Sequence, residues 1–358
     1  DRLYPDVYFK TEDELRLFTN QFYNNLVPSA VDIYSESSDL IVKSDLMLEM
    51  SGQRIIPDEG NGWNFTALRD INFYLQYSHN CTEVNARNRY DGVARFFRAY
   101  FYFEKVKRYG DIPWYDKALD SDDPELYKAR DSREFVMQKM LEDLDFAIAN
   151  LPKTKNAYVL TRWTALALKS RVCLFEGTFR KYHGLEDYEK YLNACVSASE
   201  TFMNESGYTL YKSGSTPYRD LFASINLQAD EVIFGRDYEA SLSVLHNVQN
   251  YENSTTMGRP GMNKKIVNSY LMADGSRFTD KAGYETMTFD QECQNRDPRL
   301  AQTIRTPGYT RIGSTKKEAP NLAYTMTGYH LIKYSMTANY DEYNKSCNDI
   351  PLFRTAEV

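Results

Sequence analysis

The stretch ARNRYDGVARFFRAYFYFEKVKRYGDIP, residues 86–113, decides the fold class that this chain predicts. Apolar residues recur in it at spacings of three and four, which places them on one stripe of an α-helix. These residues are Val93, Phe96, Phe97, Tyr100, Phe103 and Val106. Gly110 predicts the end of the helix, and Pro113 prevents it from resuming. The pattern is typical of a core helix in a helical domain.

Basic residues predict a polar side for the same helix. They gather towards its C-terminal half, where positive charge interacts favourably with the helix dipole. These residues are Arg95, Arg98, Lys105, Lys107 and Arg108. Ala94 and Ala99 are small enough to let a neighbouring helix approach closely. We therefore expect the five basic side chains to lie away from the core.

Helical spacing continues outside this stretch and predicts helices over residues 9–25, 63–77, 132–150, 161–177 and 187–203. Thr11, followed by Glu14, has the pattern of a capping box. Thr161 is expected to cap the fourth of these helices, and Gly177 is expected to end it. Long helices joined by short turns favour consecutive antiparallel pairs, packed like tetratricopeptide repeats. The tetratricopeptide consensus itself is not visible.

The character of the chain changes after Gly207, where periodicity fades and Gly, Ser, Thr, Asn and Pro become more frequent. A short strand is predicted over 231–234, a short helix over 263–272 and a turn-rich loop over 308–320. We expect one unit, 1–358, with a mostly helical scaffold over 1–206 and a loop-rich, ligand-binding lobe over 207–358. Binding residues are often carried by loops that a rigid scaffold positions.

Charge and hydropathy exclude two classes of partner. The 358 residues carry a formal net charge of −7 with both signs interspersed, and no basic patch suggests nucleic acid. Mean hydropathy is −0.60, and no run of 18 apolar residues predicts a membrane-spanning helix. Five cysteines without a C-x-x-C pair imply no disulfide framework, although a bond between Cys293 and Cys347 stays open.

Catalytic and metal-binding motifs are absent from the sequence. The four histidines are far apart, so a zinc site is not expected. The sequence also lacks a G-x-S-x-G motif, a P-loop and a G-x-G-x-x-G motif. No pair of carboxylates is singled out by spacing for glycosidase chemistry. We therefore expect a protein that is not an enzyme and uses no cofactor.

Two charged segments have a plain structural interpretation. Asp120, Asp122 and Asp123 are weak candidates for a calcium site, and a solvated acidic loop is the alternative. RDPRL, residues 296–300, is expected to form salt bridges and a turn around Pro298.

Aromatic composition points to noncatalytic binding. The chain has 29 Tyr and 19 Phe but 3 Trp. A sugar ring needs an aromatic platform for its apolar face and hydrogen bonds for its hydroxyls. The candidate residues are Trp63, Asn64, Trp114, Tyr115, Tyr238, His246, Asn247 and Tyr251. Trp63 could instead cap the core, Trp114 and Tyr115 are expected in an exposed loop, and most tyrosines are expected to fill helix packings.

Ten segments, in order along the chain, resemble the SusD/RagB family of surface nutrient-binding lipoproteins. They are residues 6–26, 62–75, 86–113, 129–152, 160–177, 230–234 (DEVIF), 273–275 (ADG), 296–300 (RDPRL), 328–334 (GYHLIKY) and 349–358 (DIPLFRTAEV). The resemblance implies a mainly α fold whose tetratricopeptide-like helix pairs form a right-handed superhelical scaffold. It also implies that 349–358 begins a late helix, and that 238–251 lies in a region that often lines the ligand site.

The same resemblance implies a function and a location. A glycan, or less often a peptide, would be captured at the cell surface and delivered to a SusC-like TonB-dependent transporter, with no bond made or broken. The protein would sit on the outer membrane, facing the exterior, through an N-terminal lipid anchor outside this sequence. Family members usually continue further, so we expect a C-terminal part beyond Val358. The alternatives are a helical protein–protein interaction scaffold without its own ligand site, or a glycan-processing enzyme.

Overall fold

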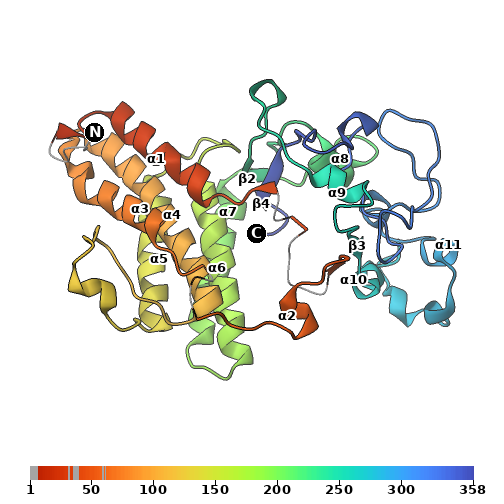
Figure 1. The fold of residues 1–358 in the computed structure, drawn as a ribbon, viewed down its shortest axis with the longest axis horizontal. Coiled ribbons are helices and arrows are strands. Elements are labelled where there is room, and N and C mark those ends of the chain that lie inside the picture. Colours follow the sequence, from red (N-terminus) through yellow and green to blue (C-terminus); the bar gives the residue numbers. More distant parts are fainter. Residues whose placement is uncertain (1–6, 31–32, 35–39, 59, 61) are drawn as a thin grey trace.

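The computed structural model describes residues 7–30, 33–34, 40–58, 60 and 62–358. Long helices gather at one end of the molecule, and short helices, turns and loops form the other end (Figure 1). The long helices are α1 (Glu12–Leu26), α3 (Thr66–Tyr77), α4 (Val84–Tyr109), α5 (Arg133–Asn150), α6 (Arg162–Tyr182) and α7 (Tyr188–Glu205). The prediction of a mainly α fold is confirmed. None of the helices in the described ranges combines the length and apolar character needed to cross a membrane.

Helix ends follow the local sequence signals in several places. The capping box of Thr11 and Glu14 is present at the start of α1. Ser132 and Thr161 cap α5 and α6 by accepting hydrogen bonds from backbone N–H groups. Gly110 ends α4 with a φ of 70°, a conformation that favours glycine.

Consecutive long helices pack as antiparallel pairs. In the α4–α5 pair, Arg98 meets Asp143, and Gly92 lies against Leu151. In the α6–α7 pair, the hydroxyls of Ser170 and Ser199 are 2.8 Å apart. The predicted helix pairs are therefore confirmed, and the right-handed superhelix stays a prediction.

The expectation that Gly177 ends α6 is wrong, because the helix continues to Tyr182. Gly177 instead allows α7 to approach. A Cβ atom at this position would lie 2.6 Å from Cδ2 of Leu192, closer than side chains can pack. The glycine therefore serves a helix contact rather than a helix end.

Arg98 is buried in the helical end, contrary to the polar position expected for it. It is 7% exposed, and its Nε and Nη2 each lie 2.7 Å from a carboxylate oxygen of Asp143 on α5. Its Nη1 also donates to the side-chain oxygen of Asn72 on α3, at 3.2 Å. A planar guanidinium suits such a two-point contact. One arginine thus connects α3, α4 and α5.

Short elements dominate the loop-rich end. They are α8 (Pro217–Ala223), β2 (Val232–Arg236), α9 (Val248–Glu252), β3 (Gly261–Met262), α10 (Lys264–Ser269), α11 (Phe289–Glu292) and β4 (Ile350–Arg354). The predicted strand at 231–234 and helix at 263–272 are confirmed as β2 and α10, and 308–320 consists of turns. Between the two ends, β1 (Ile41–Val42) pairs with β3, and α2 (Leu48–Ser51) follows β1. All five cysteines are free, so the Cys293–Cys347 bond is not formed.

The helix expected to begin within 349–358 is absent, and this segment forms a strand instead. β4 pairs antiparallel with β2, with Phe353 opposite Phe234 (Figure 1). Arg171 of α6 covers the Phe353 ring, with Cζ 3.8 Å from its centroid, and a turn follows the strand. A distant strand therefore overrides the local helical spacing.

Two separate hydrophobic clusters form the main cores. The larger one is built mostly from the long helices and includes Ile233, Phe234 and Phe353 of the β2–β4 pair. The second is built mostly from the region after residue 217, with contributions such as Tyr34. The division into a scaffold over 1–206 and a binding lobe over 207–358 stays a prediction.

Candidate functional site

Trp63 lies at a cavity of about 360 Å³ between the start of α3 and the loop that follows α4. We call this cavity the Trp63 pocket. Its lining residues are Trp63, Phe65, Thr66, Leu68, Arg69, Asn72, Tyr115, Lys117, Leu119 and Leu126. Trp63 remains 40% exposed, so its indole is available to a ligand. The pocket brings together two of the residues that the sequence singled out, Trp63 and Tyr115.

The Trp63 side chain is fixed by its neighbours although it is exposed. Phe65 and Tyr109 meet the indole edge to face, with ring centroids 5.4 and 5.0 Å away. Arg130 lies over the indole, with Cζ 4.9 Å from the centroid, which is cation–π geometry. Asn64 does not line the pocket, and its side-chain oxygen accepts the N–H of Thr66 at 2.8 Å just before α3.

The far wall of the Trp63 pocket is tied to α3. Asn72 donates to the carbonyl of Tyr115 at 2.8 Å, and Arg69 Nε donates to the carbonyl of Leu119 at 3.2 Å. The Tyr115 hydroxyl donates to the carbonyl of Leu126 at 3.3 Å. These bonds hold the loop in place, so the pocket is largely formed before a ligand arrives.

Trp114 is in the core, so the expectation that it extends an exposed loop is wrong. It is 5% exposed and stacks on Tyr102, with ring centroids 4.3 Å apart and planes at 25°. The Tyr102 hydroxyl accepts the N–H of Tyr115 at 2.6 Å. The backbone therefore turns Trp114 inwards and leaves Tyr115 half-buried at the pocket.

The structure places Tyr238 and His246 in the interior of the loop-rich end, 6% and 5% exposed. Their rings meet edge to face at 4.5 Å, and His246 Nε2 lies 2.8 Å from the carbonyl oxygen of Asn348. Burial lowers the pKa of His246 to about 4, so the ring is neutral at pH 7. Asn247 accepts a hydrogen bond from the N–H of Asn344, and Tyr251 is half-buried beside Tyr34. Burial gives Tyr238 and His246 structural roles, and ligand binding by these four residues stays a prediction.

One carboxylate of the acidic loop has a structural role. The side chain of Asp123 accepts the N–H of Glu125 at 2.9 Å and caps a short 3₁₀ helix, Pro124–Tyr127. No three His, Cys, Asp or Glu side chains in the described part of the chain are arranged to hold a metal ion. Asp120 and Asp122 are exposed, as expected for a solvated loop.

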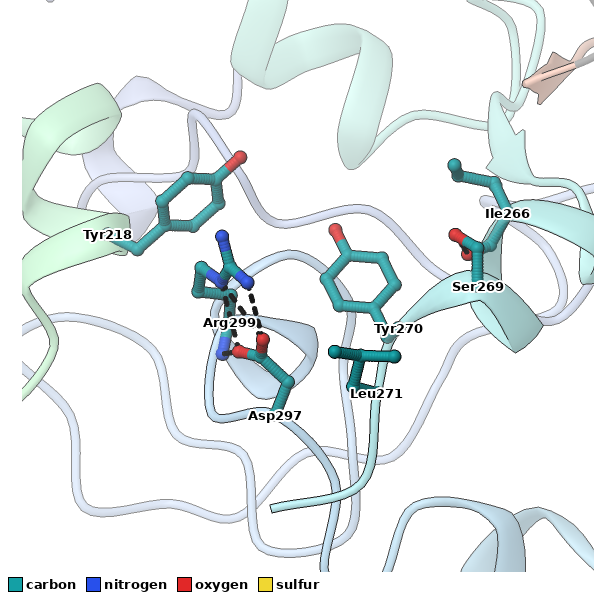
Figure 2. Close-up of a pocket in the computed structure, with 7 residues that line it drawn as sticks. All are labelled: Tyr218, Ile266, Ser269, Tyr270, Leu271, Asp297 and Arg299. Carbon is teal, nitrogen blue, oxygen red and sulfur yellow. Dashed lines mark hydrogen bonds and ion pairs between the residues drawn. The ribbon is translucent and has the colours of Figure 1, made fainter. Parts of the chain in front are cut away.

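A smaller cavity of about 250 Å³ lies in the loop-rich end between Tyr218 of α8 and Tyr270, which follows α10 (Figure 2). Arg299 and Asp297 pair between these rings, with Nη2 2.6 Å from Oδ2. The hydrogen bonds from Arg299 hold the pKa of Asp297 below its ordinary value. The salt bridge expected within RDPRL is therefore confirmed for this pair. The sequence missed Tyr218 and Tyr270, because nothing local distinguishes them from other tyrosines.

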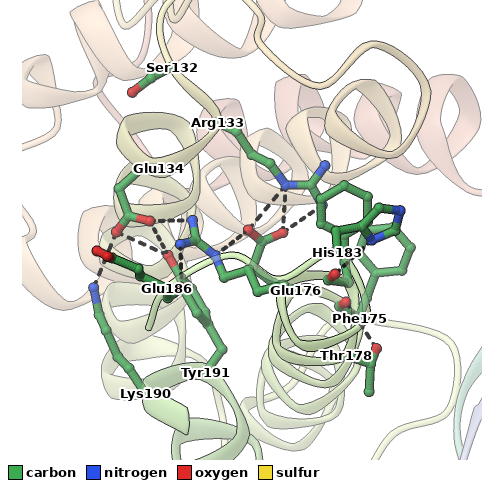
Figure 3. Close-up of polar contacts among 12 residues, drawn as sticks. Ser132, Arg133, Glu134, Phe175, Glu176, Thr178, His183, Glu186, Lys190 and Tyr191 are labelled. Atoms are coloured by element: carbon green, nitrogen blue, oxygen red, sulfur yellow. Dashed lines mark hydrogen bonds and ion pairs between the residues drawn. The ribbon is translucent and has the colours of Figure 1, made fainter. Parts of the chain in front are cut away.

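Glu134 of α5 and Glu176 of α6 both pair with Arg180 of α6 (Figure 3). A glycan-processing enzyme would need two facing carboxylates at a cleft. Glu176 is fully buried and binds both Arg133, at 2.6 Å, and Arg180, at 2.7 Å. Glu134 pairs with Arg180 and lies 3.2 Å from the Tyr191 hydroxyl. Although burial opposes it, Arg180 holds the pKa of Glu134 below its ordinary value. Both carboxylates are occupied by cations, so this cluster has a structural role.

Two models of known protein families match this chain. The model of the SusD family matches residues 197–358. A second model, described as starch-binding and associating with the outer membrane, matches residues 51–162. The chain belongs to the SusD/RagB family. The Trp63 pocket lies within the second match, and the cavity at Tyr218 and Tyr270 lies within the first.

Solved SusD-like structures share the fold of this family member. A SusD-like protein from Bacteroides fragilis has a TM-score of 0.75 at 20% identity, covering 98% of this chain and 74% of that chain. A SusD-like carbohydrate-binding protein from the same species gives 0.75 at 18% identity, covering 98% and 72%. A structure with xylogluco-oligosaccharide gives 0.64 at 17% identity, covering 96% and 69%.

A curated relative, SusD-like protein P38 from Formosa agariphila, is 26% identical over 134 residues. The match covers 37% of this chain and spans 24% of the length of that relative. This likeness agrees with the family assignment and says nothing further about the ligand.

Proposed function

We propose that this SusD-family chain binds a glycan, or another nutrient such as a peptide, at the Trp63 pocket without chemical conversion. The observation that carries the proposal is the 40% exposed indole of Trp63 at a cavity with further aromatic rings. Phe65 and Tyr115 add apolar surface for a sugar ring. Thr66, Arg69 and Lys117 are exposed and supply hydrogen-bonding groups for hydroxyls.

Binding is favoured over catalysis by the composition of the pocket. All ten of its described lining residues lack a carboxylate, whereas glycosidases use a pair of Asp or Glu side chains. A relative carries the description carbohydrate-binding, and another was crystallised with an oligosaccharide, which supports the same function here. We expect equilibrium capture and release of an unmodified ligand.

We also propose a cellular role by analogy with the family. Captured glycan would pass to a SusC-like TonB-dependent transporter, with the protein anchored by a lipid on the outer membrane and facing the exterior. The family description of starch-binding proteins that associate with the outer membrane supports this location. The helical end would then serve as the rigid scaffold behind the pocket. A protein–protein scaffold without a ligand site is the alternative.

Affinity electrophoresis in gels containing single polysaccharides tests the proposal. Wild-type protein should be retarded by its glycan, and Trp63→Ala should weaken binding by at least about tenfold, or about 1.4 kcal/mol. Tyr182→Ala is the matched control, because Tyr182 is 81% exposed at the end of α6 and lines no part of the pocket. Unchanged retardation of Trp63→Ala would remove the assignment of this pocket. Release of reducing ends during long incubation would favour the enzyme alternative.

A further inference from the structure

A polar cavity of about 560 Å³ lies in the loop-rich end, away from the residues of the Trp63 pocket. Arg305, Arg311 and Lys316 bring three cations to its lining, against two carboxylates, Glu318 and Asp341. We call it the arginine cavity. Its remaining lining residues include Tyr324, whose half-buried ring offers a flat apolar face.

The two guanidinium groups converge on a single neutral acceptor. The Arg305 and Arg311 side chains are 5% and 6% exposed, and each donates from Nη2 to Oδ1 of Asn253, at 2.8 and 2.9 Å. The amide of Asn253 is held in this orientation because its Nδ2 donates to the carbonyl of Gln249 at 3.1 Å. Two buried cations that share one amide oxygen form an electropositive wall.

The carboxylates only partly compensate these cations. Glu318 and Asp341 are 27% and 28% exposed; Oε2 of Glu318 lies 3.1 Å from Arg305 Nη1, and Oδ1 of Asp341 lies 2.6 Å from Arg311 Nη1. The buried Nε atoms of Arg305 and Arg311 have no hydrogen-bond acceptor in the described structure. The exposed side chain of Lys316 forms no ion pair with any described carboxylate.

The protonation behaviour of the surroundings agrees with excess positive charge. Burial lowers the pKa of Arg305, and the neighbouring Arg311 lowers it further. Burial and then Arg305 also lower the pKa of His330, which meets the Tyr324 ring edge to face, to about 3. Although burial opposes it, the hydrogen bond donated to Asp341 raises the pKa of Arg311. Of the two buried arginines, Arg305 is therefore the less compensated.

We propose that the arginine cavity binds an anionic substituent of a sugar, a carboxylate or a sulfate ester, so that the ligand of this protein is an acidic glycan. The planar donors of Arg305 and Arg311 fit such groups, and Lys316 at the rim attracts them. Glu318, partly exposed on the turn-rich loop, is the group that an incoming anion would replace at Arg305. The Tyr324 ring would carry the apolar face of the same sugar. This inference rests on glycan binding as the proposed function.

Titration calorimetry with three probes of equal length tests the inference. They are a galacturonate oligosaccharide, a sulfated galactan oligosaccharide and a neutral xylogluco-oligosaccharide. At low salt, at least one acidic probe should bind about tenfold or more tightly than the neutral one, since charge-assisted hydrogen bonds are the stronger kind. Added NaCl should reduce this advantage, because exposed charges are screened. The probe that binds more tightly identifies the source of the anion.

Lys316→Glu is the decisive variant, because an exposed side chain can be reversed in charge without disturbing the fold. It should weaken the preferred acidic probe by about tenfold and leave the neutral probe unchanged. Lys281→Glu, an exposed lysine outside the arginine cavity, is the matched control and should change neither. Arg305→Lys, which keeps the charge but loses the planar fork, should also weaken the acidic probe.

The outcomes separate this inference from the proposed function. Equal affinities for acidic and neutral probes, or an unchanged acidic affinity in Lys316→Glu, would overturn the acidic-glycan assignment. Binding of the neutral probe that depends on Trp63 would then leave the proposed function intact. Failure of every probe to bind would count against both.

Discussion

The two ends of the molecule bury different kinds of side chain. The helical end is built on apolar stripes such as that of α4, with ion pairs such as Arg98–Asp143 between the helices. The loop-rich end has little regular structure, and its interior contains His246, Gln249, Glu252 and His330. Hydrogen bonds from these side chains hold the loops together, whereas hydrogen bonds within the backbone hold a helix together. In the helical end, apolar packing therefore forms most of the interior, and ion pairs join neighbouring helices. In the loop-rich end, hydrogen bonds of buried polar side chains join segments that are far apart in sequence.

Glu252 illustrates the loop-rich end. It is fully buried and accepts hydrogen bonds from the hydroxyls of Tyr34 and Ser335 and from the N–H of Tyr334. Burial raises its pKa. These partners come from residue 34 and residues 334–335, so one carboxylate joins segments about 300 positions apart in sequence. Such a framework leaves no periodic signal.

Removal of a buried charge from the helical end should have the largest effect on stability. Glu176→Gln would leave Arg133 and Arg180 without a buried counter-charge (Figure 3). We expect the free energy of unfolding to fall by about 3–5 kcal/mol, the usual effect of breaking a buried pair. Glu142→Gln, which breaks an exposed pair with Lys139, is the control and should have little effect in urea unfolding. A loss no greater than that of the control would show that helical packing alone holds this end.

The two tryptophans near the pocket sharpen the contrast between core and site. Trp114→Ala should lower the free energy of unfolding by about 3–5 kcal/mol, because Trp114 is 5% exposed and stacked on Tyr102. Trp63→Ala should cost less than Trp114→Ala, since the indole is already 40% exposed and its removal uncovers less apolar surface. Thermal or urea unfolding of both variants measures the difference. Equal losses of unfolding free energy would mean that Trp63 contributes to the core as much as Trp114 does.

Acid should affect the loop-rich end through its buried histidines. His246 has a folded pKa of about 4 against about 6.5 when unfolded, so the unfolded chain binds more protons as the pH falls below 6.5. Stability from this group is present above pH 6.5 and is lost down to about pH 4. Between pH 7 and 5 the loss is about 2 kcal/mol.

His246→Gln isolates that effect, because glutamine does not titrate. The difference in unfolding free energy between wild type and variant should shrink by about 2 kcal/mol from pH 7 to pH 5. A difference that is constant with pH would mean that His246 is solvated when folded. His79→Gln, at an exposed histidine of the helical end, serves as the control.

Local signals predicted the elements whose causes are local. The Thr11 capping box, the end of α4 at Gly110 and the long helices follow from residues within a few positions of each other. The errors have distant causes. Gly177 lies against Leu192 of another helix, Arg98 is buried because it binds Asp143 and Asn72, and Trp114 is buried because it stacks on Tyr102. The strand at 350–354 depends on β2, more than 100 residues earlier.

The candidate site was predictable only in part for the same reason. Trp63 could be singled out as a tryptophan beside glycine at a helix start, and Tyr115 by its place after the GDIP segment, residues 110–113. Asn253, Arg305 and Arg311 could not be grouped, because 52 and 58 positions separate the amide from the two arginines. Their common cavity is a property of the folded loops alone.

Tryptophan fluorescence tests the central claim most directly, because the chain has 3 tryptophans and they differ in exposure. Trp63 is 40% exposed, whereas Trp114 and Trp163 are 5% and 3% exposed. Acrylamide should therefore quench mainly Trp63, and a bound glycan should protect it. We predict that saturating glycan lowers quenching in the wild type and has no such effect in Trp63→Phe. Equal protection in Trp63→Phe, or undiminished quenching with glycan bound, would contradict the placement of the ligand at this pocket.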